Sequence, residues 1–264
     1  MKTLFATIFM LMLLLPAISA QESHRLTDAE LIQLYSGLRV ADVSDGMDFI
    51  GLHDQGLMDP SIEALWKDID NFNHHICGIA VTVRYVPTNR KFPTDLSNEE
   101  YQKWVGDWYS RISSEPFIDS IHPGSVLVID NTGDGDTGTA GSNNTMTWTK
   151  RGMVALISTG GVRDTDEIIK QGIPVYMDLS KRGRGIRPGR NELESVNSPV
   201  VVGSVLVNPG DVIVADGDGV IVVPRNHAVE VAMAAHDVLK SDKAARRRLY
   251  QELGLPLDFT VEED

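Results

Sequence analysis

The pattern of apolar and polar positions predicts a strand followed by a helix in the second half of the chain. Residues 153–157 form an apolar run typical of a buried strand, and Ile168 and Ile169 begin an apolar-periodic segment that ends at Gly172. Between them lie residues 160–164 (GGVRD), whose two glycines allow a tight turn. In α/β folds such an edge commonly holds ligands, because helix N-termini and free backbone N–H groups face it.

Arg163 and Asp164 carry the candidate chemistry of this turn. A carboxylate suits a divalent cation, and a guanidinium can grip a carboxylate through two parallel hydrogen bonds. A structural interpretation stands beside it, in which Asp164 caps the helix and Arg163 is solvated. Glu167 shares a helical face with Asp164, and it is either a proton-transfer group or an ordinary first-turn glutamate.

Residues 1–20 have the pattern of a signal peptide. Lys2 supplies the positive start, residues 4–15 are apolar, and small residues lead up to Ala20. We expect cleavage near Ala20 and export to the periplasm or the medium. The apolar stretch is short for a membrane span and no cysteine follows it, so no stable membrane insertion is expected; an uncleaved anchor is the alternative.

Other periodic segments predict further elements. A capping box that begins at Thr27 opens one helix, and a helix with an aromatic stripe begins at Ser97. Residues 123–130 (PGSVLVID) are echoed by 209–216 (PGDVIVAD), and the second unit continues through a tight turn into another apolar run. These units favour a hairpin-rich sheet that resembles a barrel, and residues 226–253 read as one or two helices.

The polar loop over residues 131–145 contains G-x-G-x-x-G, but a dinucleotide site is a poor interpretation. Asp134 and Asp136 would lie against the pyrophosphate, and no acidic residue stands at the offset that the ribose requires. The loop leads into a predicted helix over residues 143–151. Backbone amides over residues 141–144 are therefore a candidate anion cradle.

Composition excludes one class of partner. The 264 residues include 24 basic and 37 acidic side chains, a formal net charge of −13. A surface this acidic repels phosphate backbones, so no nucleic-acid partner is expected. The single cysteine, Cys77, lies in an apolar run and is most simply a buried thiol.

Three stretches together resemble the RraA-like family: residues 160–168 (GGVRDTDEI), 172–176 (GIPVY) and 207–224 (VNPGDVIVADGDGVIVVP). That family includes 4-hydroxy-4-methyl-2-oxoglutarate aldolases, which also decarboxylate oxaloacetate, and proteins described as RNase E inhibitors. The resemblance implies a single α/β domain over residues 21–264, of the compact β/β/α swivelling-domain type, with a core at roughly 38–230 and a C-terminal helical tail.

The same resemblance implies a homotrimer or higher homo-oligomer with active sites at subunit interfaces. It also implies Mg²⁺ or Mn²⁺ as cofactor, Asp164 as the metal ligand and Arg163 as a substrate contact. Position 142 departs from the aldolases, which carry an acidic residue there to help hold metal-bound water. Ser142 and its neighbours Asn143 and Asn144 are polar but uncharged, which weakens metal binding and the basicity of that water.

We therefore expect a divalent-metal-dependent aldolase or decarboxylase, a carbon–carbon lyase that acts on a small 2-oxo acid through a metal-stabilised pyruvate enolate. Arg163 would bind the substrate carboxylate or the developing oxyanion, and Gly141, Ser142, Asn143 and Asn144 would add hydrogen bonds. Ser142 and Glu167 would steer the water that moves the proton. The alternative is an exported non-catalytic binding or interaction protein that retains the fold. An inhibitor of a cytoplasmic ribonuclease is a third interpretation, which the signal peptide opposes.

Overall fold

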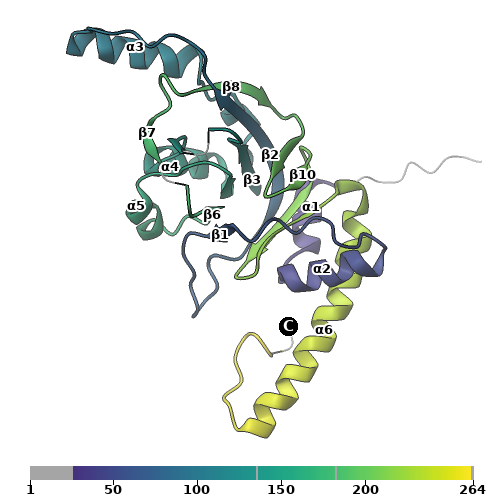
Figure 1. Cartoon of the computed structure of the whole chain (residues 1–264). Helices are drawn as coiled ribbons and strands as arrows, with labels where there is room; N and C mark the ends of the chain where they lie inside the picture. Colours follow the sequence, from purple (N-terminus) through teal and green to yellow (C-terminus); the bar gives the residue numbers. More distant parts are fainter. Residues whose placement is uncertain (1–25, 135, 182, 263–264) are drawn as a thin grey trace, which may run out of the picture.

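The largest element of the fold is a mixed sheet of eight strands (Figure 1). The computed structural model describes residues 26–134, 136–181 and 183–262, so the predicted signal peptide lies outside the described residues. The strands are β1 (Ile62–Ala64), β2 (Ile76–Pro87), β3 (Ser125–Asp130), β5 (Met153–Ser158), β6 (Val175–Asp178), β8 (Asn191–Val196), β11 (Val212–Asp216) and β12 (Gly219–Val223). Their order is β1-β6-β5-β3-β2-β11-β12, and β8 pairs with β2.

The middle of this sheet is parallel. β2 pairs with β3, β3 with β5 and β5 with β6, all in parallel register, whereas β1, β8, β11 and β12 pair antiparallel. Every residue of β3 is buried, which explains its continuous apolar run, because a parallel strand is covered on both faces. The carboxyl ends of β3, β5 and β6 therefore meet at one edge of the sheet.

The two ends of the sheet approach each other, which gives it a nearly closed, barrel-like form. Leu57, which precedes β1, forms an isolated antiparallel bridge with Ile221 of β12. The backbone N–H of Met58 donates to the carbonyl oxygen of Val220 at 2.9 Å. The predicted α/β class is confirmed, and the barrel-like expectation agrees with this closure.

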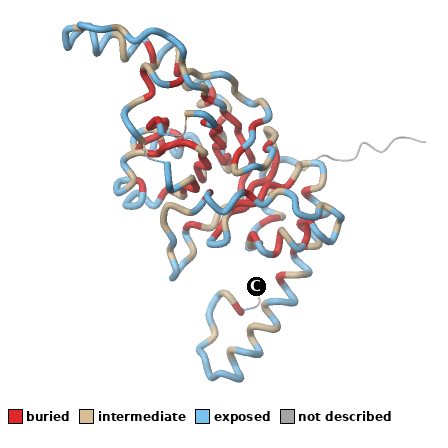
Figure 2. Tube along the Cα trace, in the orientation of Figure 1, coloured by how far each residue is buried: buried red, intermediate tan, exposed pale blue. Residues whose placement is uncertain are grey.

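Helices cover and extend the sheet. They are α1 (Asp28–Leu34), α2 (Val40–Phe49), α3 (Asn98–Arg111), α4 (Ser142–Arg151), α5 (Thr165–Lys170) and α6 (Ala228–Leu253), with 3₁₀ turns η1 (Pro116–Ser120) and η2 (Arg225–His227). α3 and the distal half of α6 project at opposite ends of the molecule and are mostly exposed (Figures 1 and 2). Among the described residues, no helix combines the length and apolar composition that a membrane crossing requires.

Local signals predicted several of these elements. Both capping boxes form, with the Thr27 and Ser97 side chains accepting from the third residue of their helices. The region predicted as one or two helices, residues 226–253, forms the end of the short turn η2 and one long helix, α6, that begins at Ala228. Two short ladders complete the fold: β4 (Thr137–Gly138) with β7 (Arg184–Ile186), and β9 (Val200–Val202) with β10 (Val205–Val207).

The echo between residues 123–130 and 209–216 was a poor guide to topology. The second unit forms the predicted hairpin, because Asp216 and Gly219 are paired across a two-residue turn between β11 and β12. The first unit supplies β3, which has parallel neighbours on both sides and forms no hairpin. The expectation of a hairpin-rich sheet is therefore wrong for its centre, since similar turn and strand sequences occur in both settings.

α2 packs against α6 at a glycine that leaves no space for a side chain. A Cβ added to Gly46 would lie 2.9 Å from both the carbonyl oxygen of Val231 and the backbone nitrogen of Ala235. These neighbours are backbone atoms of α6, so they cannot move aside as a flexible side chain would. Gly106 in α3 is the opposite case, because a Cβ there would meet nothing within 4 Å.

We expect Gly46→Ala to destabilise the protein by about 1–3 kcal/mol, because the added methyl group forces α2 away from α6. The matched change Gly106→Ala should instead stabilise it by about 0.5–1 kcal/mol, through helix propensity alone. Urea denaturation of the two variants measures both effects. Equal stabilities for the two variants would contradict the close packing of α2 on α6.

Candidate active site

Asp164 lies where the turn after β5 meets the start of α4. Its backbone is in the left-handed region (φ 54°), and it occupies the N-cap position of α5 without a side-chain capping bond. Its carboxylate turns instead toward α4, where Oδ2 accepts from the Ser142 backbone N–H at 3.2 Å and from Ser142 Oγ at 3.4 Å. A Cβ at Gly141 would lie 2.6 Å from that oxygen. The carboxylate is therefore directed at the N-terminus of α4.

Arg163 lies beside this carboxylate, and its side chain fills space that is left free by the missing side chains of two glycines. A Cβ at Gly138 or Gly183 would lie 2.1 or 2.3 Å from the Arg163 side chain, so larger residues there would displace it. Its Nη1 donates to the carbonyl oxygen of Gly185 at 3.1 Å, and its Nη2 is 3.9 Å from Asp164 Oδ1. The side chain is 36% exposed. Its outer N–H groups can therefore meet a ligand from solvent.

The start of α4 carries backbone N–H groups that an anion could accept from. Gly141 is its N-cap residue and supplies no capping side chain. The backbone N–H groups of Asn143 and Asn144 belong to the first turn, where an α-helix has no intrahelical acceptor for them. The positive end of the helix dipole adds to their attraction for an anion. The structure thus brings together Arg163, Asp164 and the predicted cradle.

Asn144 is held in one orientation by a carboxylate that the sequence analysis did not identify. Its Nδ2 donates to Glu115 Oε1 at 2.9 Å. An ionised carboxylate only accepts hydrogen bonds, so it fixes which end of the amide faces it. The other end, Oδ1, faces the Gly141 side, 3.9 Å from the place a Cβ would occupy. This neutral oxygen and Asp164 Oδ2 therefore lie on the same side of Gly141, in a region where the aldolases are expected to carry an acidic residue.

Glu115 is itself fixed by a buried charge. Its carboxylate accepts from Trp148 Nε1 at 3.1 Å and forms an ion pair with Arg187. Arg187 is only 3% exposed; it donates to the Tyr85 hydroxyl at 2.7 Å and lies over the Tyr109 ring. These residues come from separate stretches of chain and form no motif. Only the tertiary structure could reveal them.

Glu167 is the predicted site residue for which the structure shows no direct link to the others. Its side chain is exposed on α5, and no hydrogen bond or ion pair joins it to Ser142, Arg163 or Asp164. Asp164 is the N-cap residue of α5 and has a left-handed backbone, so it is not itself part of the helix. The i, i+3 argument applies only within a continuous helix. A role for Glu167 stays a prediction.

Asp164 could hold a divalent cation with few protein ligands. Within residues 26–134, 136–181 and 183–262, no three His, Cys, Asp or Glu side chains are grouped to bind a metal. Mg²⁺ commonly keeps several waters and uses one or two carboxylates, so a single carboxylate fits its chemistry. Asp164 Oδ1 is the oxygen that Ser142 does not engage. A single carboxylate of this kind would hold such an ion weakly.

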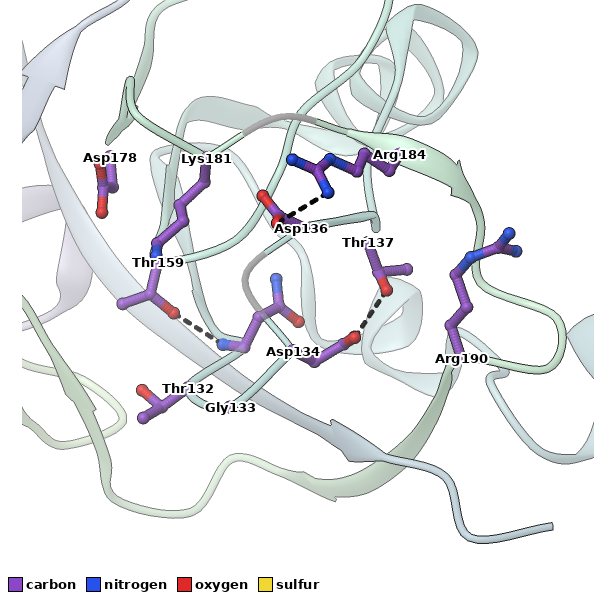
Figure 3. Close-up of a pocket in the computed structure, with 11 residues that line it drawn as sticks. Thr132, Gly133, Asp134, Asp136, Thr137, Thr159, Asp178, Lys181, Arg184 and Arg190 are labelled. Atoms are coloured by element: carbon purple, nitrogen blue, oxygen red, sulfur yellow. Dashed lines mark hydrogen bonds and ion pairs between the residues drawn. The ribbon is translucent and has the colours of Figure 1, made fainter.

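A cavity of about 640 Å³ opens at the same edge of the sheet (Figure 3). It is lined by residues that follow or end the parallel strands, such as Asn131 after β3, Thr159 after β5 and Asp178 of β6. Arg163 and Asp164 do not line it. The loop carboxylates Asp134 and Asp136 belong to this cavity rather than to the Arg-Asp turn.

We expect Glu115→Gln to destabilise the fold by about 3 kcal/mol, because it leaves the buried Arg187 charge without its anion. The matched change Asp107→Asn breaks the exposed Arg111–Asp107 pair and should have little effect. Chemical denaturation measures both. A small effect of Glu115→Gln would show that the carboxylate does not fix this network.

Known proteins of similar sequence indicate the family to which the chain belongs. The chain is 29% identical over 207 residues to protein DlpA of Legionella pneumophila, covering 78% of this chain and 29% of DlpA. It is 30% identical over 128 residues to a protein named a putative 4-hydroxy-4-methyl-2-oxoglutarate aldolase from Halalkalibacterium halodurans, covering 48% of this chain and 59% of that one. The chain thus spans less than two thirds of either relative.

Structural similarity supports the fold. The crystal structure of RraAS2 from Streptomyces coelicolor, an unusual member of the RNase ES inhibitor RraA family, superimposes with a TM-score of 0.64 at 22% identity, covering 83% of this chain and 97% of that one. The family model described as Aldolase/RraA matches residues 40–222, which is more than half of the sequence. The chain belongs to the RraA-like family.

Proposed function

We propose that this protein is a divalent-metal-dependent carbon–carbon lyase, an aldolase or decarboxylase that acts on a small 2-oxo acid. The observation that carries the proposal is the direction of the Asp164 carboxylate. Although Asp164 occupies a helix N-cap position, its side chain forms no cap and instead faces the α4 N-terminus beside Arg163. A purely structural aspartate would be expected to cap its own helix.

Arg163 and the start of α4 are suited to hold the two ends of a 2-oxo acid group. The guanidinium would bind the carboxylate or the developing oxyanion, because one of its nitrogens is anchored on Gly185 and the others remain directed outward. The first-turn amides of α4 would donate to the other oxygens. When bound, Mg²⁺ or Mn²⁺ would supply Lewis-acid polarisation of the keto group.

The chemistry needs one bond to break and one proton to move. In a 4-hydroxy-2-oxo acid, the C4 hydroxyl loses its proton and the C3–C4 bond breaks. Its electron pair becomes the enolate of pyruvate, and C4 leaves as a carbonyl compound. With oxaloacetate, the same electron pair is released by loss of CO₂. Protonation of the enolate at C3 then gives pyruvate.

Ser142 is better placed than Glu167 to help move that proton. Its hydroxyl lies 3.4 Å from Asp164 Oδ2, at the centre of the proposed site, whereas Glu167 is exposed on α5. Ser142 has no charge, so it would orient a water or relay a proton rather than act as a base. We therefore expect a slower reaction than an acidic residue at this position would support.

A non-catalytic exported binding or interaction protein is the second candidate. Ser142 favours it, because the first turn of α4 then has no acidic residue to share a cation with Asp164. Export after cleavage near Ala20 and assembly as a homotrimer or higher homo-oligomer remain parts of the proposal under either function. The ribonuclease-inhibitor interpretation gains nothing from the site, and the proposed export opposes it, because an exported protein would not meet a cytoplasmic enzyme.

Pyruvate release from oxaloacetate and from 4-hydroxy-2-oxo acids tests the proposal. We expect turnover with Mg²⁺ or Mn²⁺ that EDTA removes. Arg163→Ala should lower kcat/KM by about tenfold or more, through loss of a charge-assisted contact. Asp164→Asn should have a larger effect, because it removes the charged oxygen that would hold the cation.

Asp166→Asn is the matched control for Asp164→Asn. Asp166 is exposed two residues away on α5 and lies outside the proposed site, so its change should preserve turnover. Metal-independent turnover, or equal losses in the two Asp variants, would contradict the proposal. No turnover of any 2-oxo acid by a folded oligomer would favour the binding protein instead.

A further inference from the structure

The cavity of Figure 3 is separated from the Arg163–Asp164 site by the short β4–β7 ladder. Successive side chains of a strand point to opposite faces. The missing Cβ of Gly138 points at Arg163, only 2.1 Å from its side chain, whereas Thr137 lines the cavity. Arg184 of β7 lines the cavity as well (Figure 3). The two sites therefore occupy opposite faces of one ladder.

The cavity contains a lysine that can receive an anion. No hydrogen bond or ion pair joins the Lys181 ammonium to another part of the chain that the structure describes. Its side chain extends toward the Thr159 side of the cavity (Figure 3). By contrast, Arg184 lies 3.8 Å from Asp136, and Arg190 donates to the carbonyl oxygen of Ile186 at 2.8 Å. Lys181 is therefore the cation that a carboxylate would meet.

The cavity also contains a buried hydrogen-bond acceptor, the side-chain oxygen of Asn131, to which no described residue donates. Asn131 is fully buried (0% exposed) and lines the cavity, and its Oδ1 has no hydrogen-bond partner among the described residues. The amide is confined, because its Nδ2 donates to Ser158 Oγ at 3.4 Å and a Cβ at Gly160 would lie 2.1 Å from it. A buried acceptor without a partner is costly, so this oxygen favours a donor from a ligand.

Asp134, which also lines the cavity, has a second buried acceptor oxygen of this kind. Its Oδ1 accepts from Thr137 Oγ1 at 2.6 Å, while its Oδ2 is buried without a hydrogen-bond partner among the described residues. Burial raises the pKa of this carboxyl above its usual value. Three hydroxyl side chains, Thr132, Thr137 and Thr159, complete a lining typical of sites that bind alcohol groups.

The charges of the lining also limit the ligand. Among the described lining residues, Asp134, Asp136 and Asp178 stand against Lys181, Arg184 and Arg190, so a singly charged ligand suits this wall better than a multiply charged anion such as phosphate. Within the described residues no three His, Cys, Asp or Glu side chains are grouped to bind a metal, so a metal ion is not the ligand that this lining favours. The volume of about 640 Å³ is typical of small-molecule sites.

We propose that this cavity is a second binding site, distinct from the Arg-Asp turn, for a small monocarboxylic acid that carries several hydroxyl groups, such as a sugar acid. The carboxylate binds Lys181, and ligand hydroxyls donate to Asn131 Oδ1 and Asp134. This site goes beyond the proposed lyase function and does not depend on it.

Isothermal titration calorimetry with aldonic acids of four to six carbons, gluconate among them, tests the proposal on the full-length mature protein. We expect at least one of these acids to bind with a Kd of about 1 mM, a value typical of small polar ligands. Sorbitol lacks the carboxylate and hexanoate lacks the hydroxyls, so both should bind at least about tenfold more weakly.

Lys181→Met should weaken aldonate binding by about tenfold or more, because it removes the charged donor and retains most of the apolar stem. Lys170→Met, on the exposed face of α5, should leave it unchanged, and so should Arg163→Ala. The proposal is overturned if no aldonate binds at about 10 mM, some tenfold above the expected Kd. It is equally overturned if Arg163→Ala abolishes binding while Lys181→Met does not, or if hexanoate binds as tightly as gluconate.

Discussion

The site depends on the left-handed backbone of Asp164. A residue with a side chain rarely adopts φ 54°, because the conformation costs about 1–3 kcal/mol and persists only where surrounding contacts offset that cost. Here the turn is fixed on both sides. The Arg163 backbone N–H donates to Ala140 at 2.9 Å, and the Asp164 carboxylate accepts two hydrogen bonds from Ser142. The conformation directs the carboxylate away from its own helix, α5, and toward α4, the helix that precedes it in the chain.

The parallel strands at the centre of the sheet place the start of α4 beside the Arg163–Asp164 turn. Because β3, β5 and β6 run in the same direction, the segments that follow them leave from one edge. The segment after β3 supplies Gly141 and α4, and the segment after β5 supplies Arg163 and Asp164. A buried ion pair, Glu115–Arg187, then fixes Asn144 at the start of α4. The β4–β7 ladder divides the edge into two faces with different lining chemistry.

Local sequence signals predicted the parts of this arrangement that arise over short distances. The capping boxes, the β11–β12 hairpin and the helix that ends at Gly152 follow from residues within a few positions of one another. Arg163 and Asp164 were found because a strand, two glycines and a helix are adjacent in sequence. The parallel pairing of β3 was not predicted, because its partners β2 and β5 are distant in sequence and only the complete sheet determines which strands pair.

Contacts between distant segments could not be predicted from the sequence. Glu115 and Arg187 are 72 positions apart, and neither belongs to a motif. The cavity at Asn131 and Lys181 also combines separate loops. For Glu167 the i, i+3 rule gives no placement, because it assumes a helical residue at Asp164 and the Asp164 backbone is left-handed.

The most direct test of the central claim is a titration of the metal-free protein with Mn²⁺, followed by the electron paramagnetic resonance signal of the free ion. The account predicts that the wild-type protein binds Mn²⁺ and that Asp164→Asn abolishes this binding, whereas Asp134→Asn, in the other cavity, preserves it. Unchanged Mn²⁺ affinity in Asp164→Asn would contradict the account, because the turned carboxylate would then have no part in holding a cation.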